Sequence, residues 1–108
     1  MPRYIVKLAD DIFVEWSTVS DCYVTPAMNK EELREYCKES RPDQDPDHVV
    51  NRVIARGHSA MWMYENMTPE DAVSGNRCGP NETQATLEEI IADVVARRDE
   101  NAQKAKTT

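Results

Sequence analysis

YIVKLADDIFVEW, the sequence of residues 4–16, decides the fold of this chain. Two runs of β-branched and aromatic residues, 4–8 and 12–16, flank a short acidic turn, and this pattern predicts an antiparallel hairpin. Pairing Leu8 with Ile12 across a three-residue loop makes one face of the hairpin entirely apolar. The other face, which we expect to be partly exposed and to hold a diagonal ion pair, carries Ile5, Lys7, Phe13 and Glu15.

Cap signals predict two helices after the hairpin. Asn29, with Glu32 three positions later, forms a capping box before a helix over about residues 30–39. Asp45 and the proline that follows it are typical of the cap and first position of a second helix, which Gly57 ends.

The C-terminal helix is the clearest element of the sequence. Thr86 and Glu89 form a capping box, and the apolar residues that follow recur at i, i+3, i+4, i+7 and i+8. These residues are Leu87, Ile90, Ile91, Val94 and Val95. Beyond them only alanines interrupt the polar side chains, so we predict one domain over residues 1–98 and a frayed polar tail over 99–108. A shorter helix is expected after Thr68.

Residues 59–65, SAMWMYE, predict a further strand that is apolar on both sides. With the hairpin and a candidate short strand at 22–25, it makes a small sheet against which three or four helices pack, an α+β fold. Either the C-terminal helix covers the second face of this sheet in a three-layer domain, or part of that face stays open as a protein-binding surface. The side chains that such a surface would offer are Phe13, Trp62, Met63, Tyr64 and Met67.

Acidic residues outnumber basic ones by 20 to 13, which gives a formal net charge of -7. A field of this sign repels phosphate backbones and anionic membranes, so we expect no direct binding to nucleic acid or to membranes. The apolar runs are far shorter than the roughly 20 residues of a transmembrane helix, and the first residues lack a signal-peptide pattern. We therefore expect a cytoplasmic protein. The acidic charge allows one alternative function, a mimic of nucleic acid that inhibits a DNA- or RNA-binding protein.

The three cysteines, Cys22, Cys37 and Cys78, have wide spacings and form no CxxC pair, which favours free thiols in a reducing compartment. No short cysteine or histidine spacing indicates zinc and no glycine-rich loop indicates a bound phosphate, so we predict neither metal nor cofactor. Cys78 lies in a polar loop beside Arg77, where we expect an exposed and reactive thiol. A small enzyme that uses Cys78 with His58 is a second alternative, against the interpretation of His58 as a partly exposed linker residue.

The stretch from Tyr4 to Val19, YIVKLADDIFVEWSTV, resembles the opening of small proteins of unknown function from tailed phages of actinobacteria. Residues 55–59 and 71–77 are similar to the same proteins. The resemblance implies a phage origin and a location in the cytoplasm of the infected cell, and it carries over no catalytic residues. Our leading hypothesis is a non-enzymatic accessory protein that binds another protein, either a host factor or a second copy of itself in a homo-oligomer.

Overall fold

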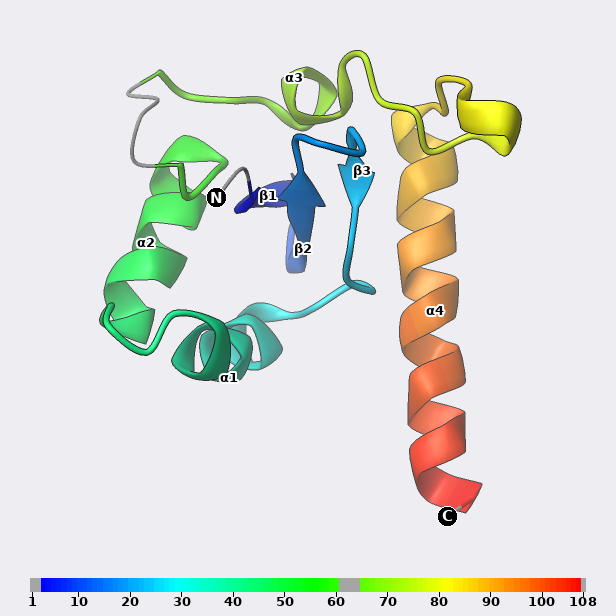
Figure 1. The fold of residues 1–108 in the computed structure, drawn as a ribbon. Helices are drawn as coiled ribbons and strands as arrows, with labels where there is room; N and C mark the ends of the chain where they lie inside the picture. Colours follow the sequence, from blue (N-terminus) through cyan, green and yellow to red (C-terminus); the bar gives the residue numbers. More distant parts are fainter. Residues whose placement is uncertain (1–2, 61–64, 108) are drawn as a thin grey trace.

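An antiparallel sheet of three strands lies between two layers of helices (Figure 1). The computed structural model describes the backbone of residues 3–60 and 65–107 and, within these ranges, the side chains up to residue 100. The strands are β1 (Arg3–Ala9), β2 (Ile12–Ser17) and β3 (Cys22–Tyr23), so that β2 is central and β3 is an edge strand. The helices are α1 (Lys30–Ser40), α2 (Pro46–Arg56), α3 (Pro69–Val73), the 3-10 turn η1 (Pro80–Glu82) and α4 (Leu87–Thr107).

The predicted hairpin is present, but its turn is tighter than expected. The confirmed cross-strand pairs are Tyr4 with Trp16 and Val6 with Val14. The expected pair of Leu8 with Ile12 is wrong, because Ala9 pairs with Ile12 and the register shifts next to Leu8. Asp11 adopts a φ of 58°, a left-handed conformation that aspartate tolerates, and this permits a two-residue turn. The bulge absorbs the extra residue while Leu8 stays buried in the core.

Helices α1 and α2 cover the face of the sheet that carries Ile5 and Phe13. Both side chains are buried, against apolar residues of the two helices: Leu33, Cys37, Val49, Val50 and Val53. The expectation that this face is partly exposed is therefore wrong, because α1 and α2 together seal it. Lys7 pairs with Asp10 at 3.5 Å and not with Glu15, which is buried.

Helices α3 and α4 cover the opposite face, so the domain has three layers (Figure 1). The C-terminal helix therefore lies over the apolar face of the hairpin, and the expectation that it covers the face of Ile5 and Phe13 is wrong. The core on this side contains Tyr4, Val6, Leu8, Val14, Trp16, Ile90 and Val94. The predicted capping box begins α4, because Thr86 and Glu89 exchange hydrogen bonds of 2.9 and 3.1 Å. The backbone of residues 99–107, where we expected a frayed tail, is helical. None of the helices in the described part of the chain combines the length and the apolar character needed to cross a bilayer.

The predicted caps of the two middle helices are confirmed. Asn29 and Glu32 form both bonds of the capping box of α1, and the Asp45 side chain accepts a hydrogen bond at the start of α2. Gly57 ends α2 with a φ of 85°. A Cβ at this position would lie 2.0 Å from the carbonyl oxygen of Met67, so glycine is required both for conformation and for space.

The segment after α2 joins the free edge of β1 over a short distance. His58 forms an isolated bridge with Val6, and the Ser59 backbone N–H donates to the carbonyl of Ile5 at 2.9 Å. The described residues of the expected 59–65 strand, Ser59, Ala60 and Glu65, are not in a strand. The remaining positions of that expected strand, 61–64, lie outside the described residues.

Candidate functional site

The side chains predicted to contact a partner do not form an open surface in the described part of the chain. Phe13 is 2% exposed, so it packs within the protein and the prediction for this residue is wrong. Met67 is half-buried and packs against the core on the side of α3 and α4. Trp62, Met63 and Tyr64 lie outside the described residues.

His58 is a fully buried structural residue and not the partly exposed linker residue that we expected. Its Nδ1 accepts a hydrogen bond from the Ala60 backbone N–H at 3.1 Å, so the ring proton is on Nε2 and is donated to the carbonyl of Glu65 at 2.8 Å. Its ring also packs edge-on against Tyr4, with 6.4 Å between centroids. Both nitrogens are thus occupied, and neither is available as a general base.

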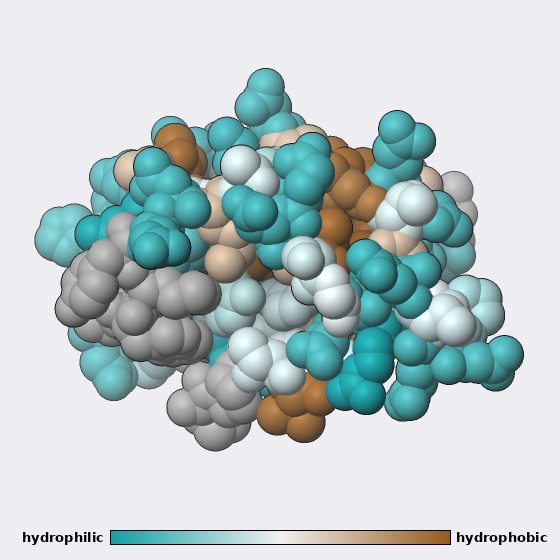
Figure 2. Space-filling view, turned by 90° about the horizontal axis from the view of Figure 1, so that it is seen from above, coloured by the Kyte–Doolittle hydropathy of each residue, from teal (hydrophilic) through white to brown (hydrophobic). Residues whose placement is uncertain are grey.

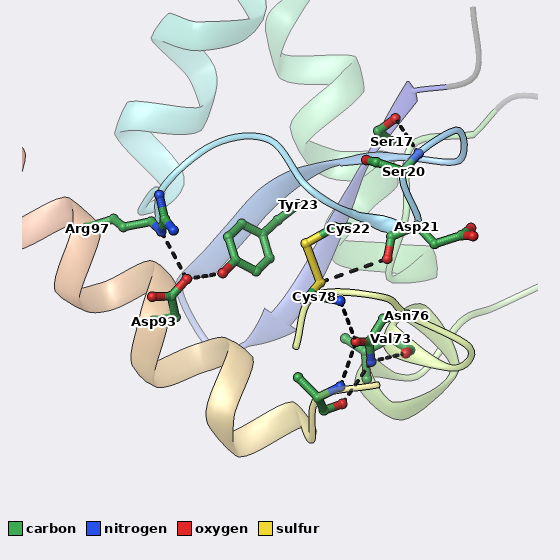
Figure 3. Close-up of a disulfide and its surroundings, with 11 residues drawn as sticks. Ser17, Ser20, Asp21, Cys22, Tyr23, Val73, Asn76, Cys78, Asp93 and Arg97 are labelled. Carbon is green, nitrogen blue, oxygen red and sulfur yellow. Dashed lines mark hydrogen bonds and ion pairs between the residues drawn. A yellow bond between two sulfur atoms is a disulfide. The ribbon is translucent and has the colours of Figure 1, made fainter. Parts of the chain in front are cut away.

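Cys22 and Cys78 form a disulfide, which overturns the expectation of three free thiols (Figure 3). Their Cα atoms are 5.3 Å apart, although 56 positions separate them in the sequence. Cys37 is the free cysteine, and burial raises the pKa of its thiol. The alternative of an enzyme that pairs Cys78 with His58 therefore lacks both an available thiolate and an available imidazole.

Asn76 brings the Cys78 loop to the edge of the sheet. This side chain is 2% exposed and fastens both ends of the loop, which begins after α3 and ends before α4 (Figure 3). Its Nδ2 donates to the carbonyls of Val73 and Ala85 at 2.7 and 2.8 Å. Its Oδ1 accepts from the backbone N–H groups of Cys78 and Ala85 at 3.1 and 2.9 Å. All four polar positions of the amide are therefore used to shape one loop.

Arg77 ties the same loop to the turn that precedes β3. Its backbone N–H donates to the carbonyl of Asp21 at 3.0 Å, and its guanidinium lies 3.3 Å from the Asp21 carboxylate. Nη2 also donates to the carbonyl of Val19 at 3.3 Å. The loop is held beside β3 by these contacts in addition to the disulfide.

Tyr23 joins β3 to α4 through a shared carboxylate. Its hydroxyl donates to Oδ2 of Asp93, and Nε of Arg97 donates to the same oxygen at 2.9 Å (Figure 3). The Arg97 guanidinium also lies 5.8 Å from the centroid of the Tyr23 ring, within range of a cation–π interaction.

A cavity of about 470 Å³ opens between the edge of the sheet and α4. Residues from β3, from the Cys78 loop and from α4 surround it: Cys22, Tyr23, Val24, Thr25, Pro26, Arg77, Cys78, Arg97 and Glu100. A second cavity of about 320 Å³ lies toward the start of α4 and shares Tyr23, Cys78 and Arg97 with the first. These volumes are in the range of small-molecule sites, so we treat this region as the candidate site.

Beyond the point where Arg77 bonds to Asp21, the outer edge of β3 offers the backbone groups of Tyr23 beside this cavity. Tyr23 lies opposite Trp16, and the Val24 N–H donates to the carbonyl of Glu15 at 2.8 Å. In an antiparallel ladder this places the N–H and C=O of Tyr23 on the side away from β2. No hydrogen bond joins these two groups to any residue in the ranges 3–60 and 65–107. Val24, which is 41% exposed, follows directly.

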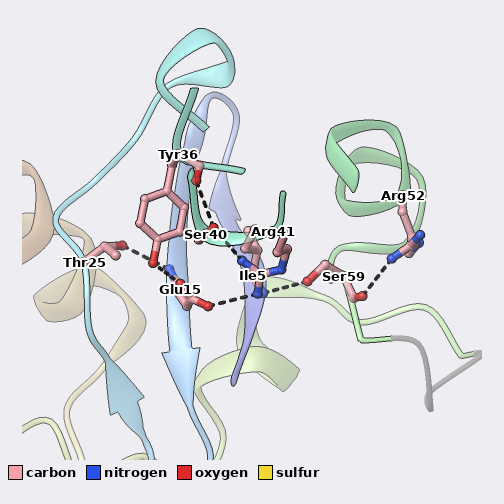
Figure 4. A network of polar contacts seen from close by, with 8 residues as sticks. All are labelled: Ile5, Glu15, Thr25, Tyr36, Ser40, Arg41, Arg52 and Ser59. Carbon is pink, nitrogen blue, oxygen red and sulfur yellow. Dashed lines mark hydrogen bonds and ion pairs between the residues drawn. The ribbon is translucent and has the colours of Figure 1, made fainter. Parts of the chain in front are cut away.

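A second polar cluster lies on the other side of the sheet, around the buried carboxylate of Glu15 (Figure 4). Arg41 donates to Glu15 at 2.9 Å, and the Tyr36 hydroxyl donates to its other oxygen. Burial, followed by the hydrogen bond to Glu15, raises the pKa of Tyr36. Each charge is compensated within the cluster, which fastens α1 to β2, so the cluster is structural.

Acidic side chains on the surface are interleaved with basic ones. Exposed ion pairs join Arg34 to Asp47, Arg98 to Glu32 and Lys38 to Glu35 at 2.7 to 3.0 Å. Figure 2 shows a face on which hydrophilic side chains surround patches of apolar surface. Such mixing does not favour the alternative of a nucleic-acid mimic, which needs a continuous acidic stripe. The described side chains also contain no group of three or more metal-ligating residues.

Comparison with protein-family models, with curated proteins and with solved structures finds no match to this chain.

Proposed function

We propose that this chain is a non-enzymatic accessory protein of a tailed actinobacterial phage that binds another protein through the free edge of β3. The observation that carries the proposal is the outward-facing backbone N–H and C=O of Tyr23 at the rim of a cavity. Exposed strand edges accept an extended segment of a partner as an additional strand. The resemblance of residues 4–19 to phage proteins supports the proposed origin.

Exposed apolar side chains on both sides of β3 support the same surface. The large hydrophobic residues with the greatest exposure in the described chain are Val19 at 71%, Ile54 at 43% and Val24 at 41%. Val19 and Val24 flank β3, whereas Ile54 lies on α2. Apolar side chains that surround unpaired backbone groups are typical of an interface and raise the affinity of an added strand.

The chemistry of the cavity wall selects the occupant, an extended partner segment with an apolar residue beside Val24 and an acidic residue beside Arg97. Arg97 is 59% exposed and donates Nε–H to Asp93, which leaves its Nη groups for a second carboxylate. Because β3 has two residues, few backbone hydrogen bonds are available, and side-chain contacts must supply much of the affinity.

Site-specific photo-crosslinking tests the proposal. A photoreactive amino acid replaces Val24 in one variant and Ile54 in another, because both side chains have similar exposure but Val24 follows β3 and Ile54 lies on α2. We expect the first variant to cross-link one protein of the infected host at an extended segment, and the second not to do so. Amide exchange of Tyr23 should slow when that segment is added as a synthetic peptide.

Other outcomes would contradict the proposal. Equal cross-linking from both positions would indicate a nonspecific surface, and no cross-linking from position 24 in infected cells would remove the β3 edge as the interface. Cross-links between two copies of this chain, with a dimer in sedimentation velocity, would replace the partner segment by self-association.

A further inference from the structure

The disulfide lies where a small molecule can reach it. Cys22 and Cys78 are both half-buried and both line the 470 Å³ cavity. Cys78 also lines the 320 Å³ cavity on the other side of Tyr23. A disulfide sulfur that is accessible to a dissolved thiol can exchange without unfolding of the protein.

The two cysteines stay close together without the bond between their sulfur atoms. Asn76 shapes the loop by four hydrogen bonds, and the Arg77 backbone N–H joins this loop to Asp21, the residue before Cys22. These contacts involve neither sulfur. After reduction the two thiols are therefore held at a high effective concentration, which favours formation of the same disulfide again.

Cationic groups on the cavity wall suit a thiol that carries carboxylates. Arg77 and Arg97 both line the cavity, and Glu100 is the acidic side chain that lines it with them. Each guanidinium has five N–H groups, of which the ion pairs with Asp21 and Asp93 use a part. The others can bind a carboxylate by charge-assisted hydrogen bonds.

We propose that Cys22–Cys78 is a reversible thiol–disulfide exchange site for small thiols that carry carboxylates, the chemical class of glutathione. The thiolate of the small molecule attacks Sγ of Cys78, which borders both cavities, and forms a mixed disulfide. The Cys22–Cys78 bond breaks, and its electron pair leaves on Sγ of Cys22 as a thiolate.

A second small thiol completes the reduction. Its thiolate attacks the small-molecule sulfur of the mixed disulfide, releases the oxidised small molecule, and leaves Cys78 as a thiolate. The two protein thiolates take up the protons that the two small thiols lost. In balance, one protein disulfide and two small thiols give one protein dithiol and one small disulfide, and the exchange requires no partner protein.

Intact-mass spectrometry of acid-quenched samples tests the exchange. We expect the folded, air-oxidised protein to form the dithiol at a rate proportional to the glutathione concentration and unchanged by urea below the unfolding transition. Replacement of glutathione by oxidised glutathione, which takes up the two electrons, should restore the disulfide with an unchanged near-ultraviolet circular dichroism spectrum. In the Cys22→Ser variant, oxidised glutathione should add one glutathione at Cys78.

Matched arginine variants test the selection of carboxylate-bearing thiols. The Arg77→Gln/Arg97→Gln variant should react several-fold more slowly with glutathione and at an unchanged rate with the neutral thiol 2-mercaptoethanol. Arg34→Gln, which removes an exposed arginine between α1 and α2, is the control and should leave both rates unchanged. If the double variant does not fold, Arg97→Gln alone allows the same comparison, since this side chain is 59% exposed.

Three results would overturn the proposal. The first is the absence of the disulfide from the purified, air-exposed protein, and the second is reduction that occurs only at urea concentrations that unfold it. The third is a ratio of the glutathione rate to the 2-mercaptoethanol rate that is the same in the wild type and in the Arg77→Gln/Arg97→Gln variant. None of these results bears on cross-linking at Val24, so this inference and the proposed function can fail separately.

Discussion

Glu15 and Arg41 form an ion pair of 2.9 Å between the central strand and the end of α1, with both side chains largely removed from solvent. The pair is 26 positions apart in the sequence. We expect Arg41→Met to lower the free energy of unfolding by about 3–5 kcal/mol, because it leaves a buried carboxylate without its cation. The double variant Glu15→Leu/Arg41→Met should lose much less stability. Urea denaturation of the wild type, the two single variants and the double variant, in a double-mutant cycle, measures the difference. A double variant as unstable as the single one would contradict this account.

Removal of the disulfide should destabilise the protein without unfolding it. We expect Cys22→Ser/Cys78→Ser to lower the free energy of unfolding by about 2–4 kcal/mol, since the bond closes a loop that spans 56 positions. The variant should keep the circular dichroism spectrum of the wild type because Asn76 and Arg77 still hold the loop. Reduced wild-type protein is the control and should show the same loss in urea denaturation.

Asn76 is the polar side chain whose loss should affect the site most. Asn76→Ala should lower the free energy of unfolding by about 3 kcal/mol, because the carbonyl of Val73 and the half-buried backbone groups of Ala85 lose their partners. Gln84→Ala, an exposed position in the same connection, should change it by less than about 0.5 kcal/mol. A similar small effect of both substitutions would show that the loop is held by other contacts.

Two glycines with positive φ should respond differently to alanine. Gly75→Ala has open space around the new Cβ and should cost about 1 kcal/mol for the left-handed conformation. In Gly57→Ala the new Cβ also clashes with the carbonyl oxygen of Met67, so this variant should lose about 3 kcal/mol or more of unfolding free energy. Thermal or urea unfolding of the two variants measures this order, and equal losses would contradict the close approach.

The pH dependence of stability should include a contribution from Glu89. Hydrogen bonds from the backbone and side chain of Thr86 lower the pKa of Glu89 below its ordinary value of 4.5. A lowered folded-state pKa means that this stabilisation is complete above pH 4.5 and is lost as the pH falls through the pKa of the folded state. Glu89→Gln should therefore flatten the decline of stability in acid, measured by urea denaturation between pH 3 and 7. Gln84→Ala, an exposed and uncharged position before the same helix, is the control and should leave the decline unchanged.

Local patterns predicted most of the elements correctly. The boundaries of α1 and α2 and the start of α4 follow from cap residues that act on backbone groups within three or four positions. The pairing of Val6 with Val14 follows from the alternation of apolar residues. The bulge at Leu8 was not predicted, because a three-residue and a two-residue turn give the same apolar face as long as Leu8 stays inside.

The candidate site was predicted poorly, because each of its features depends on contacts between distant segments. Spacing alone favoured free thiols, yet the loop around Asn76 carries Cys78 to Cys22. A signal for this was present in the polar run from Asn76 to Asn81, whose turn residues predict a loop but not the surface on which it lies. For His58 the local pattern was misleading. Its position after a helix-ending glycine suggested exposure, but it is buried where its backbone forms a bridge with Val6.

The amino-acid sequence by itself determined the hairpin, the helix ends and the acidic surface, because hydrogen bonds to near neighbours and the periodicity of side chains act along a few residues of chain. The tertiary structure decided which face each helix covers, which cysteines join, and where the edge of β3 stays open. These outcomes depend on contacts between segments that are far apart in the sequence, such as the ion pair across 26 positions and the disulfide across 56. Only the packing of the whole chain brings such segments together.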